Sequence, residues 1–517
     1  MPPMAPDSPS TAALEAAIAA GEVVSEVGEH APPESAHGGD GDTIVAVVTG
    51  AQPGAAVAIV RLSGPEAVAV AQRVFRQSGG HRGDQGGTQA PWQPETHCVY
   101  HGRLVDDSGA ALDEVLALAM LAPRSYTRED VVELHTHGGA VCAARAVTAC
   151  LAAGARRARA GEFTLRAFLN GRLDLAQAEA VAALVGARTA AAADSALAGL
   201  AGGAGAAVAA MRAAALSLLA EIEAGIDFEV ELPQADVAAL RTRLEALRND
   251  VEGALATARR GQLLNRGLQV ALVGRPNVGK SSLLNALSGS ERAIVTHIPG
   301  TTRDVVEAGM EVGGVAVTLL DTAGLRAASD AVERIGVARS HAAAAAADVV
   351  MLVYDAQVGW TEADAAAAEG LWGGRQANQS LPRPALAGAG RLLHARSAAD
   401  AAAAATSPAG TAAVATAGAD DEATTHRADG AAVAHAAGLA QVAPGGQAWA
   451  VNERQAEALQ RAAEALRCAA ASAADGLPLD FWALDLRGAL LALGEVTGDE
   501  ASEQVLDEVF SSFCIGK

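Results

Sequence analysis

Lysine is nearly absent from this sequence. It occurs at only two of 517 positions, Lys280 and Lys517, and arginine supplies every other strongly basic side chain. The formal net charge is −22, which argues against a protein that holds nucleic acid over a broad basic surface, because such binding needs clustered cations opposite the phosphates. If RNA is the substrate, a local group of arginines or a partner protein must provide most of the attraction.

The low numbers of cysteine and aromatic residues, and the lack of long apolar runs, limit the class of protein further. The five cysteines form no C-x-x-C pair and are odd in number, which fits a reducing compartment rather than a disulfide-stabilised secreted protein. Aromatic residues make up only 3% of the chain, so the cores must consist mostly of alanine, valine and leucine. No apolar run of roughly 18 or more residues is free of charges and glycine, so we expect no membrane span.

The composition changes along the chain in a way that predicts several domains. Residues 1–42 hold eight acidic residues and no lysine or arginine, which is typical of a disordered acidic tail and unlike a transit peptide. Residues 43–162 combine short β-rich runs with helical stretches and predict an N-terminal α+β domain. Apolar residues recur at helical spacing in 163–264, and 449–517 is a second helical block. We expect the two blocks to form one discontinuous all-α domain.

An inserted nucleotide-binding domain is predicted between the helical blocks. Residues 265–372 alternate apolar strands with helical stretches, as a Ras-like α/β domain requires. Residues 274–281, Gly-Arg-Pro-Asn-Val-Gly-Lys-Ser, fit the P-loop pattern G-x-x-x-x-G-K-[ST]. In such a loop backbone N–H groups surround the phosphates, Lys280 reaches the β- and γ-phosphates, and the Ser281 hydroxyl holds Mg²⁺. The motif in this context predicts a nucleotide-binding protein.

Two further motifs follow at the spacing of a GTPase. Residues 321–324, Asp-Thr-Ala-Gly, begin 41 positions after Lys280 at the end of an apolar run. They fit the D-x-x-G segment that senses Mg²⁺ and the γ-phosphate. The intervening stretch 296–304 contains Gly-Thr-Thr-Arg-Asp and predicts a switch I, in which Thr302 is the second hydroxyl ligand of Mg²⁺.

Motifs from every domain together resemble one family. The switch motifs resemble the TrmE/Era/EngA group of GTPases, and the flanking domains resemble MnmE (TrmE), a family of tRNA-modifying GTPases. The stretches that carry the second likeness are 43–46, 59–64, 160–164, 166–175 and the C-terminal Phe-Cys-Ile-Gly-Lys of 513–517. The likeness covers about 43–360 and 449–517, and the stretch 121–130 resembles the cyanobacterial and plastid branch.

The resemblance implies a fold and a nucleotide site. The fold would be an N-terminal α+β folate-binding domain, a discontinuous helical domain and an inserted P-loop G domain, assembled as a homodimer. GTP would be bound with Mg²⁺ and K⁺, the K⁺ taking the place of an arginine finger. The implied nucleotide-binding residues are Asn277, Val278, Gly279, Lys280, Ser281, Ser282, Thr296, His297, Ile298, Pro299, Gly300, Thr301, Thr302, Asp321, Thr322, Ala323 and Gly324.

Metal and catalytic roles within that site are implied in the same way. Ser281 and Thr302 would hold Mg²⁺, and K⁺ would be held by Asn277, Thr296, Ile298 and Thr301. Glu333 matches the family's water-orienting glutamate, and the alternative is a solvated glutamate at a helix start. Leu325 stands where a Ras-type protein has its water-orienting glutamine.

The resemblance also implies the chemistry. Such proteins act with an FAD-dependent MnmG-like partner, which supplies most of the contact with tRNA, to add an aminomethyl-type group at C5 of the wobble uridine. A tetrahydrofolate derivative, in its 5-formyl or methylene form, supplies the carbon. The implied folate-binding residues are Arg61, Glu133, Arg172 and Lys517, and the candidate catalytic thiol is Cys514. The alternatives are a surface charge for Arg61, a structural ion pair for Glu133 and an incidental thiol for Cys514.

One expected motif is missing. Guanine recognition normally uses [NT]-K-x-D, and no lysine lies between Lys280 and Lys517. The segment 373–448 is low-complexity sequence in place of the end of the G domain, so this domain is predicted to be incomplete. Either an error of gene prediction or splicing replaced the true end, or the G domain has lost base specificity. In the second case we expect poor discrimination of GTP from ATP.

Two other functions compete with a GTP-hydrolysing tRNA modification enzyme. A ribosome-assembly GTPase of the Era/EngA kind would carry a basic KH-like domain or a second G domain. A degenerate folate-binding or dimerisation scaffold would lack GTP hydrolysis. The branch resemblance favours a chloroplast over a mitochondrion, or the cytoplasm if the protein is bacterial, although no clear transit peptide is present.

Overall fold

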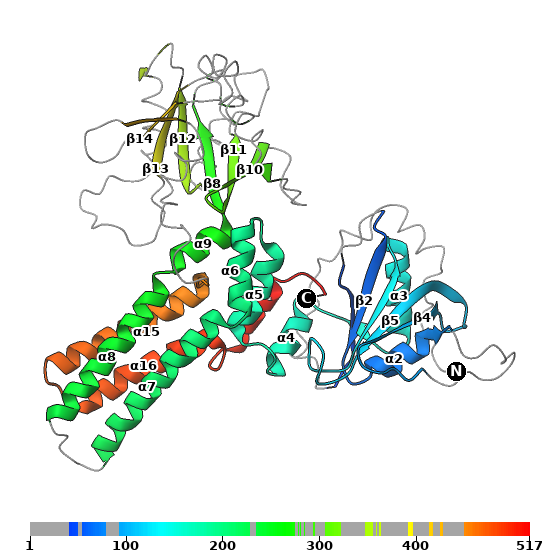
Figure 1. Cartoon of the computed structure of the whole chain (residues 1–517), viewed down its shortest axis with the longest axis horizontal. Coiled ribbons are helices and arrows are strands. Elements are labelled where there is room, and N and C mark those ends of the chain that lie inside the picture. The colour runs from blue at the N-terminus through cyan, green and yellow to red at the C-terminus, as the bar shows by residue number, and fades with distance from the viewer. Residues whose placement is uncertain are drawn as a thin grey trace, which may run out of the picture. The chain divides into compact units, whose positions relative to one another are not determined.

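The chain folds into two compact units, which are Met1–Ala122 with Glu129–Arg157 and Pro123–Arg128 with Ala158–Lys517. The computed structural model (Figure 1) describes residues 41–49, 54–78, 92–227, 234–274, 278, 280, 284, 293–294, 306–321, 347–354, 358, 361–362, 391–396, 413–416, 424–427 and 449–516. The acidic tail predicted for 1–42 therefore lies almost wholly outside the described residues.

The first unit is built on a seven-stranded sheet in the order β3-β4-β5-β6-β2-β1-β7. Two helices, α2 and α3, place alanines and valines in the same core as the strands. This is the α+β arrangement that the sequence predicts. The elements are β1 Ile44–Val47, β2 Val57–Ser63, α2 Ala67–Val74, β3 Phe75–Gln77, β4 Cys98–Val105, β5 Ala111–Met120, β6 Val131–His137, α3 Ala140–Ala152 and β7 Arg156–Arg157.

The boundary of this unit differs from the predicted range 43–162. Pro123–Arg128 and the residues after Arg157 belong to the second unit. Side-chain hydrogen bonds explain the first departure, because Asn170 Nδ2 donates to the Thr127 carbonyl at 2.7 Å and the Tyr126 hydroxyl lies 3.0 Å from that of Thr164. An isolated antiparallel bridge between Ala160 and Ile515 explains the second.

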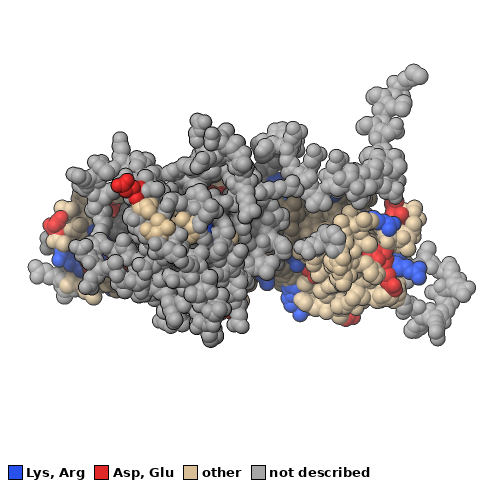
Figure 2. Space-filling model, turned by 90° about the horizontal axis from the view of Figure 1, so that it is seen from above, with Lys and Arg blue, Asp and Glu red and all other residues tan. Residues whose placement is uncertain are grey.

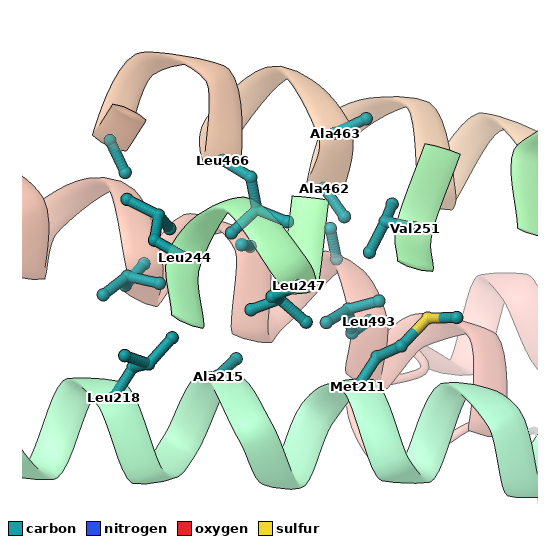
Figure 3. Packing of buried hydrophobic residues seen from close by; sticks show 14 of the residues in the cluster. Met211, Ala215, Leu218, Leu244, Leu247, Val251, Ala462, Ala463, Leu466 and Leu493 are labelled. Carbon is teal, nitrogen blue, oxygen red and sulfur yellow. The ribbon is translucent and has the colours of Figure 1, made fainter. Parts of the chain in front are cut away.

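The two helical blocks share one hydrophobic core. Figure 3 shows Met211, Ala215 and Leu218 of α7 facing side chains of α8, α15 and α16. Residues more than 200 positions apart thus form a single discontinuous helical domain, as predicted. Its helices are α4 Glu162–Leu169, α5 Leu175–Gly186, α6 Ala190–Leu200, α7 Gly203–Asp227, α8 Gln234–Leu255, α9 Ala258–Arg266, α15 Glu453–Ala474, α16 Leu479–Thr497 and α17 Glu503–Ser511.

One of these helices, α7, is long and apolar enough to cross a membrane by length and composition. Its residues Val208, Ala215, Leu218 and Ile222 are, however, almost fully buried in the core of the helical domain. Such a helix is expected at the centre of a helical bundle, where it is covered by apolar neighbours. The composition of α7 is therefore that of a core helix.

The inserted domain contains an eight-stranded sheet in the order β15-β14-β13-β12-β8-β11-β10-β9. The apolar strands predicted within 265–372 include β8, β10, β11 and β12. The bounds are β8 Leu268–Val273, β9 Ala293–Ile294, β10 Val306–Val312, β11 Val315–Asp321, β12 Val349–Tyr354, β13 Arg391–Arg396, β14 Ala413–Thr416 and β15 Thr424–Arg427.

The sheet extends beyond residue 372, where the predicted regular structure ends. Within 373–448, β13 pairs in parallel with β12, and β14 and β15 continue the sheet with antiparallel pairing. The prediction missed β13 because its sequence, Arg-Leu-Leu-His-Ala-Arg, has no β-branched residue and no alternation. Backbone pairing with a neighbouring strand overrides such weak local preference. These strands do not supply the missing guanine-recognition motif, because no lysine of an [NT]-K-x-D motif lies between Lys280 and Lys517.

Candidate functional site

The central strands bring two predicted phosphate-sensing segments to one edge of the sheet. β8 and β11 are parallel neighbours, and Asp321 is aligned with Leu272. Gly274, the first residue of the P-loop, directly follows β8, and Asp321, the first residue of D-x-x-G, ends β11. Ligands of open α/β sheets bind at this carboxyl edge. The strand register therefore places the starts of both motifs side by side.

Gly274 lies against the neighbouring strand β12. A Cβ atom built on Gly274 would be 2.1 Å from the carbonyl oxygen of Val353, so only a residue without a side chain fits. The glycine thus lets the chain leave β8 close to the sheet before it enters the loop. Val278, which is buried within the loop, packs into the apolar core of the domain.

Lys280 is a largely buried cation over the P-loop. Its residue is only 5% exposed, and its Nζ donates a hydrogen bond to the Gly274 carbonyl oxygen at 2.6 Å. This contact holds the ammonium group beside the backbone that would surround a phosphate. A compact ammonium with three donors can satisfy the carbonyl and still bind phosphate oxygens.

Most of the remaining nucleotide-site predictions fall outside the described residues. For Asp321 the backbone is described and its side chain is not. The predicted residues outside the description are Asn277, Gly279, Ser281, Ser282, Thr296, His297, Ile298, Pro299, Gly300, Thr301, Thr302, Thr322, Ala323, Gly324 and Glu333, as well as the C-terminal Lys517. Their roles in binding Mg²⁺, K⁺, nucleotide and folate remain predictions.

Two of the predicted folate residues form an ion pair in the first unit. Arg61 on β2 is aligned with Glu133 on β6, and Arg61 Nε donates to Glu133 Oε1 at 2.8 Å. The alternation along β2 buries Ala58, Val60 and Leu62, so Arg61 lies on the face opposite the core. His135, two positions along β6, has its Nε2 3.5 Å from Glu133 Oε2. These side chains form a polar strip across two adjacent strands.

Arg172, the third predicted folate residue, is held in the second unit. Its Nη1 donates to the Tyr126 carbonyl oxygen at 3.1 Å, and its guanidinium carbon lies 4.8 Å from the centre of the Tyr126 ring. The residue remains exposed. The contact therefore orients the guanidinium by a cation–π interaction while leaving donors accessible to an anion.

Charges of both signs are mixed on the described surface. Figure 2 shows basic and acidic side chains in small neighbouring groups on the face that it presents. Several arginines are paired with glutamates, as in Arg243–Glu221 and Arg487–Glu223. On the described part of this face, basic and acidic side chains therefore lie close to one another (Figure 2).

Comparison with known proteins identifies the family. The family described as "GTP-binding protein TrmE N-terminus" matches residues 43–172, and the "MnmE helical domain" family matches residues 175–514. A tRNA modification GTPase MnmE from Synechococcus sp. (strain JA-2-3B'a(2-13)) is 48% identical over 482 residues, which are 92% of this chain and 98% of that protein. The chain belongs to the MnmE family of tRNA modification GTPases. A relative of the same name from Cyanothece sp. (strain PCC 7425) is 48% identical over 479 residues, or 92% of this chain and 99% of that protein.

The helical domain contains an ion pair that the sequence patterns did not indicate. Arg454 at the start of α15 makes a two-point contact with Glu179 of α5, with Arg454 Nη2 2.9 Å from Glu179 Oε2. Gln455 Nε2 donates to the same oxygen at 2.6 Å. Residues 275 positions apart carry no local signal of such pairing. This contact joins α5 to α15 at the point where the chain returns from the inserted domain to the helical domain.

A cleft of about 760 Å³ lies beside this ion pair in the helical domain. It is bordered by α5, α15, α16 and α17, and its lining includes six glutamates and two arginines. The excess of carboxylates makes the cleft unsuited to a phosphate or to the glutamate end of a folate, because like charges repel. The cleft therefore differs in charge from the two sites predicted to bind anions, which are the phosphate site of the P-loop and the folate site.

The cysteines differ in exposure, which predicts their reactivity. Cys514, the candidate thiol of the family motif, and Cys468 are exposed, whereas Cys150 is buried. Burial raises the pKa of the Cys150 thiol to about 12, so at pH 8 only about one molecule in 10⁴ carries the reactive thiolate there. We expect N-ethylmaleimide to label Cys514 and Cys468 in the folded protein and Cys150 only after denaturation, as measured by peptide mass spectrometry. Labelling of Cys150 at the rate of Cys468 would contradict this assignment.

Proposed function

We propose that this protein hydrolyses GTP and acts with an FAD-dependent MnmG-like partner in tRNA modification. The product is an aminomethyl-type group at C5 of the wobble uridine, and a tetrahydrofolate derivative in its 5-formyl or methylene form donates the carbon. The family membership supports GTP hydrolysis and tRNA modification. The observation that supports GTP hydrolysis is the buried Lys280, whose Nζ contacts Gly274 directly after β8, at the edge where β11 also ends.

We assign different roles in GTP hydrolysis to Lys280, to the residues that would hold Mg²⁺ and K⁺, and to Glu333. Lys280 offsets the negative charge that develops on the transferred phosphoryl group, an effect that is strong where water is excluded. Ser281 and Thr302 would hold Mg²⁺, and Asn277, Thr296, Ile298 and Thr301 would hold K⁺ when the G domains of a homodimer meet. Mg²⁺ and K⁺ supply positive charge to the phosphates. Glu333 would orient the attacking water.

The polar strip on β2 and β6 fits the pteridine end of a folate. Glu133 accepts from Arg61 through Oε1, and a carboxylate has several lone pairs with which it can also accept from the ring N–H donors of a pterin. Arg172 and Lys517 are cations suited to the glutamate carboxylates of folate. Cys514, exposed and three residues from the C-terminus, is the thiol that we assign to the carbon-transfer step.

Loss of the wobble modification tests this function. Nucleosides from the tRNA of a deletion strain, analysed by mass spectrometry, should lack the C5-modified wobble uridine, and the wild-type gene should restore it. Glu133→Gln should restore at least tenfold less, because it removes the charge that holds Arg61 and the pterin. The control is Glu114→Gln, in an exposed pair with His101 on the same sheet, which should restore fully. Normal modification in the deletion strain would refute the proposal.

A scaffold without guanine specificity is the second candidate, since the described strands β13–β15 come without an [NT]-K-x-D motif. Competition between GTP and ATP for the purified full chain separates the two. Selective binding of GTP with hydrolysis stimulated by K⁺ over Na⁺ supports the enzyme. Equal binding of both nucleotides without hydrolysis supports the scaffold. The cyanobacterial relatives fit a chloroplast protein and a cytoplasmic bacterial protein alike, and fluorescent tagging of the gene product in its own cell separates the two.

A further inference from the structure

The tip of the β10–β11 hairpin is fastened to the helical domain by one hydroxyl group. Thr189 Oγ1 donates to the Gly314 carbonyl oxygen at 2.7 Å and accepts from the backbone N–H of Ala192 at 3.1 Å. The second bond caps the N-terminus of α6. Thr189 is 8% exposed. A single buried hydroxyl therefore ties the start of a helix to the turn before β11.

Packing reinforces this hydrogen bond on both sides. Arg188 Nη2 donates to Thr318 Oγ1 of β11 at 3.1 Å. Ala192 of α6 and Leu264 of α9 are buried within the apolar core of the G-domain sheet. A Cβ atom on Gly314 would lie 2.8 Å from Ala191 Cβ. The hairpin and the start of α6 are thus in direct van der Waals contact.

β11 connects this contact to the nucleotide site. It begins at Val315, next to Gly314, and ends at Asp321, the first residue of D-x-x-G. Seven residues of strand span about 20 Å. β11 is paired along its length with β10 and, from Val317 onward, with β8. Because pairing on both sides makes β11 stiff along its length, a displacement at Asp321 would reach the hairpin tip.

We propose that Thr189 is a positioning residue that acts through β11 on Asp321 and couples the nucleotide state to α6. This inference rests on the proposed GTPase function and adds a path by which the nucleotide site communicates with the helical domain. When Asp321 responds to the γ-phosphate and its Mg²⁺, β11 shifts. The shift changes the hydrogen bonds of Thr189 and, with them, how often the first turn of α6 opens. The helical domain in turn holds Asp321 in place for hydrolysis.

A coupling role for Thr189 and a purely structural role predict different effects of a substitution. A static contact would lower stability in all nucleotide states alike. A coupling contact changes the difference between states. Thr189→Val keeps the shape of the side chain and removes the hydroxyl, whereas Thr189→Ser keeps the hydroxyl. Ser502, whose side chain caps α17, offers a matched control because Ser502→Ala also removes a helix cap in the same domain.

Hydrogen–deuterium exchange of the full chain with GDP and with a non-hydrolysable GTP analogue provides the test. In the wild type, Thr189→Ser and Ser502→Ala, amides of α6 should exchange at least threefold differently between the two states. In Thr189→Val that difference should fall at least threefold, and kcat for GTP should fall while KM changes less than twofold. Arg188→Ala, which leaves the cap intact, should reduce the difference partially and serves if Thr189→Val fails to fold.

The outcomes separate this inference from the proposed function. If the wild type binds both nucleotides and α6 exchanges identically, or if Thr189→Val and Arg188→Ala keep the full difference, the coupling is refuted and the GTPase assignment stands. If the wild type binds neither nucleotide, the proposed function is refuted, and the coupling is refuted with it.

Discussion

Lys280→Ala is expected to lower the rate of GTP hydrolysis by about 10²–10³-fold, the usual effect of removing one preorganised charge-stabilising donor. The side chain is only 5% exposed and lies against Gly274, so water cannot replace the lost ammonium group effectively. The loss should appear in kcat as well as in nucleotide affinity, because the charge on the phosphates grows in the transition state. Phosphate release at saturating GTP measures it.

The matched variants distinguish this role from a general effect of charge. Lys280→Arg should remain at least tenfold impaired, because the planar guanidinium is larger and cannot occupy the same buried position. Arg266→Ala removes an exposed cation at the end of α9 and should leave the rate within twofold of the wild type. A Lys280→Ala protein that hydrolyses GTP within tenfold of the wild-type rate would contradict the assignment.

The features that the sequence predicts well are those set by local pattern. The apolar run of β8 and the glycine–lysine spacing after it identify the P-loop, because the conformation of this short segment itself requires these residue types. The short β-rich runs of the first unit are equally local. The capping boxes of α5 and α15, Asp174 with Gln177 and Asn452 with Gln455, each lie within four residues of sequence, and they are local signals by which these helix starts could have been found.

The features that the sequence did not predict depend on distant partners. β13 has no strand-like pattern of its own and is defined by its pairing with β12. The segment Pro123–Arg128 lies in the second unit because of bonds to Thr164 and Asn170. The Thr189–Gly314 contact joins residues 125 positions apart. One sequence without an alignment carries no record of which distant residues meet, so tertiary contacts overrode local propensity at these points.

Arg454→Ala is expected to destabilise the helical domain by about 2–3 kcal/mol, somewhat below the range for fully buried ion pairs because the arginine is 23% exposed. The change leaves the carboxylate of Glu179, only 11% exposed, without its cation. It also removes a bond of 2.7 Å from Arg454 Nη1 to the Glu495 carbonyl near the end of α16. Urea unfolding followed by far-UV circular dichroism, which reports mainly on helices, measures the loss.

Arg461, two turns further along the same helix, provides the control. It pairs with Glu495 through two bonds, one of 2.8 Å from Nη1, but its side chain is 58% exposed. Water and salt screen such a pair, so Arg461→Ala should cost less than about 1 kcal/mol. The double variant Glu179→Gln with Arg454→Ala should be less destabilised than the sum of the single variants, because the buried charge left by one is removed by the other. Equal losses for Arg454→Ala and Arg461→Ala would show that burial does not set the strength of the pair.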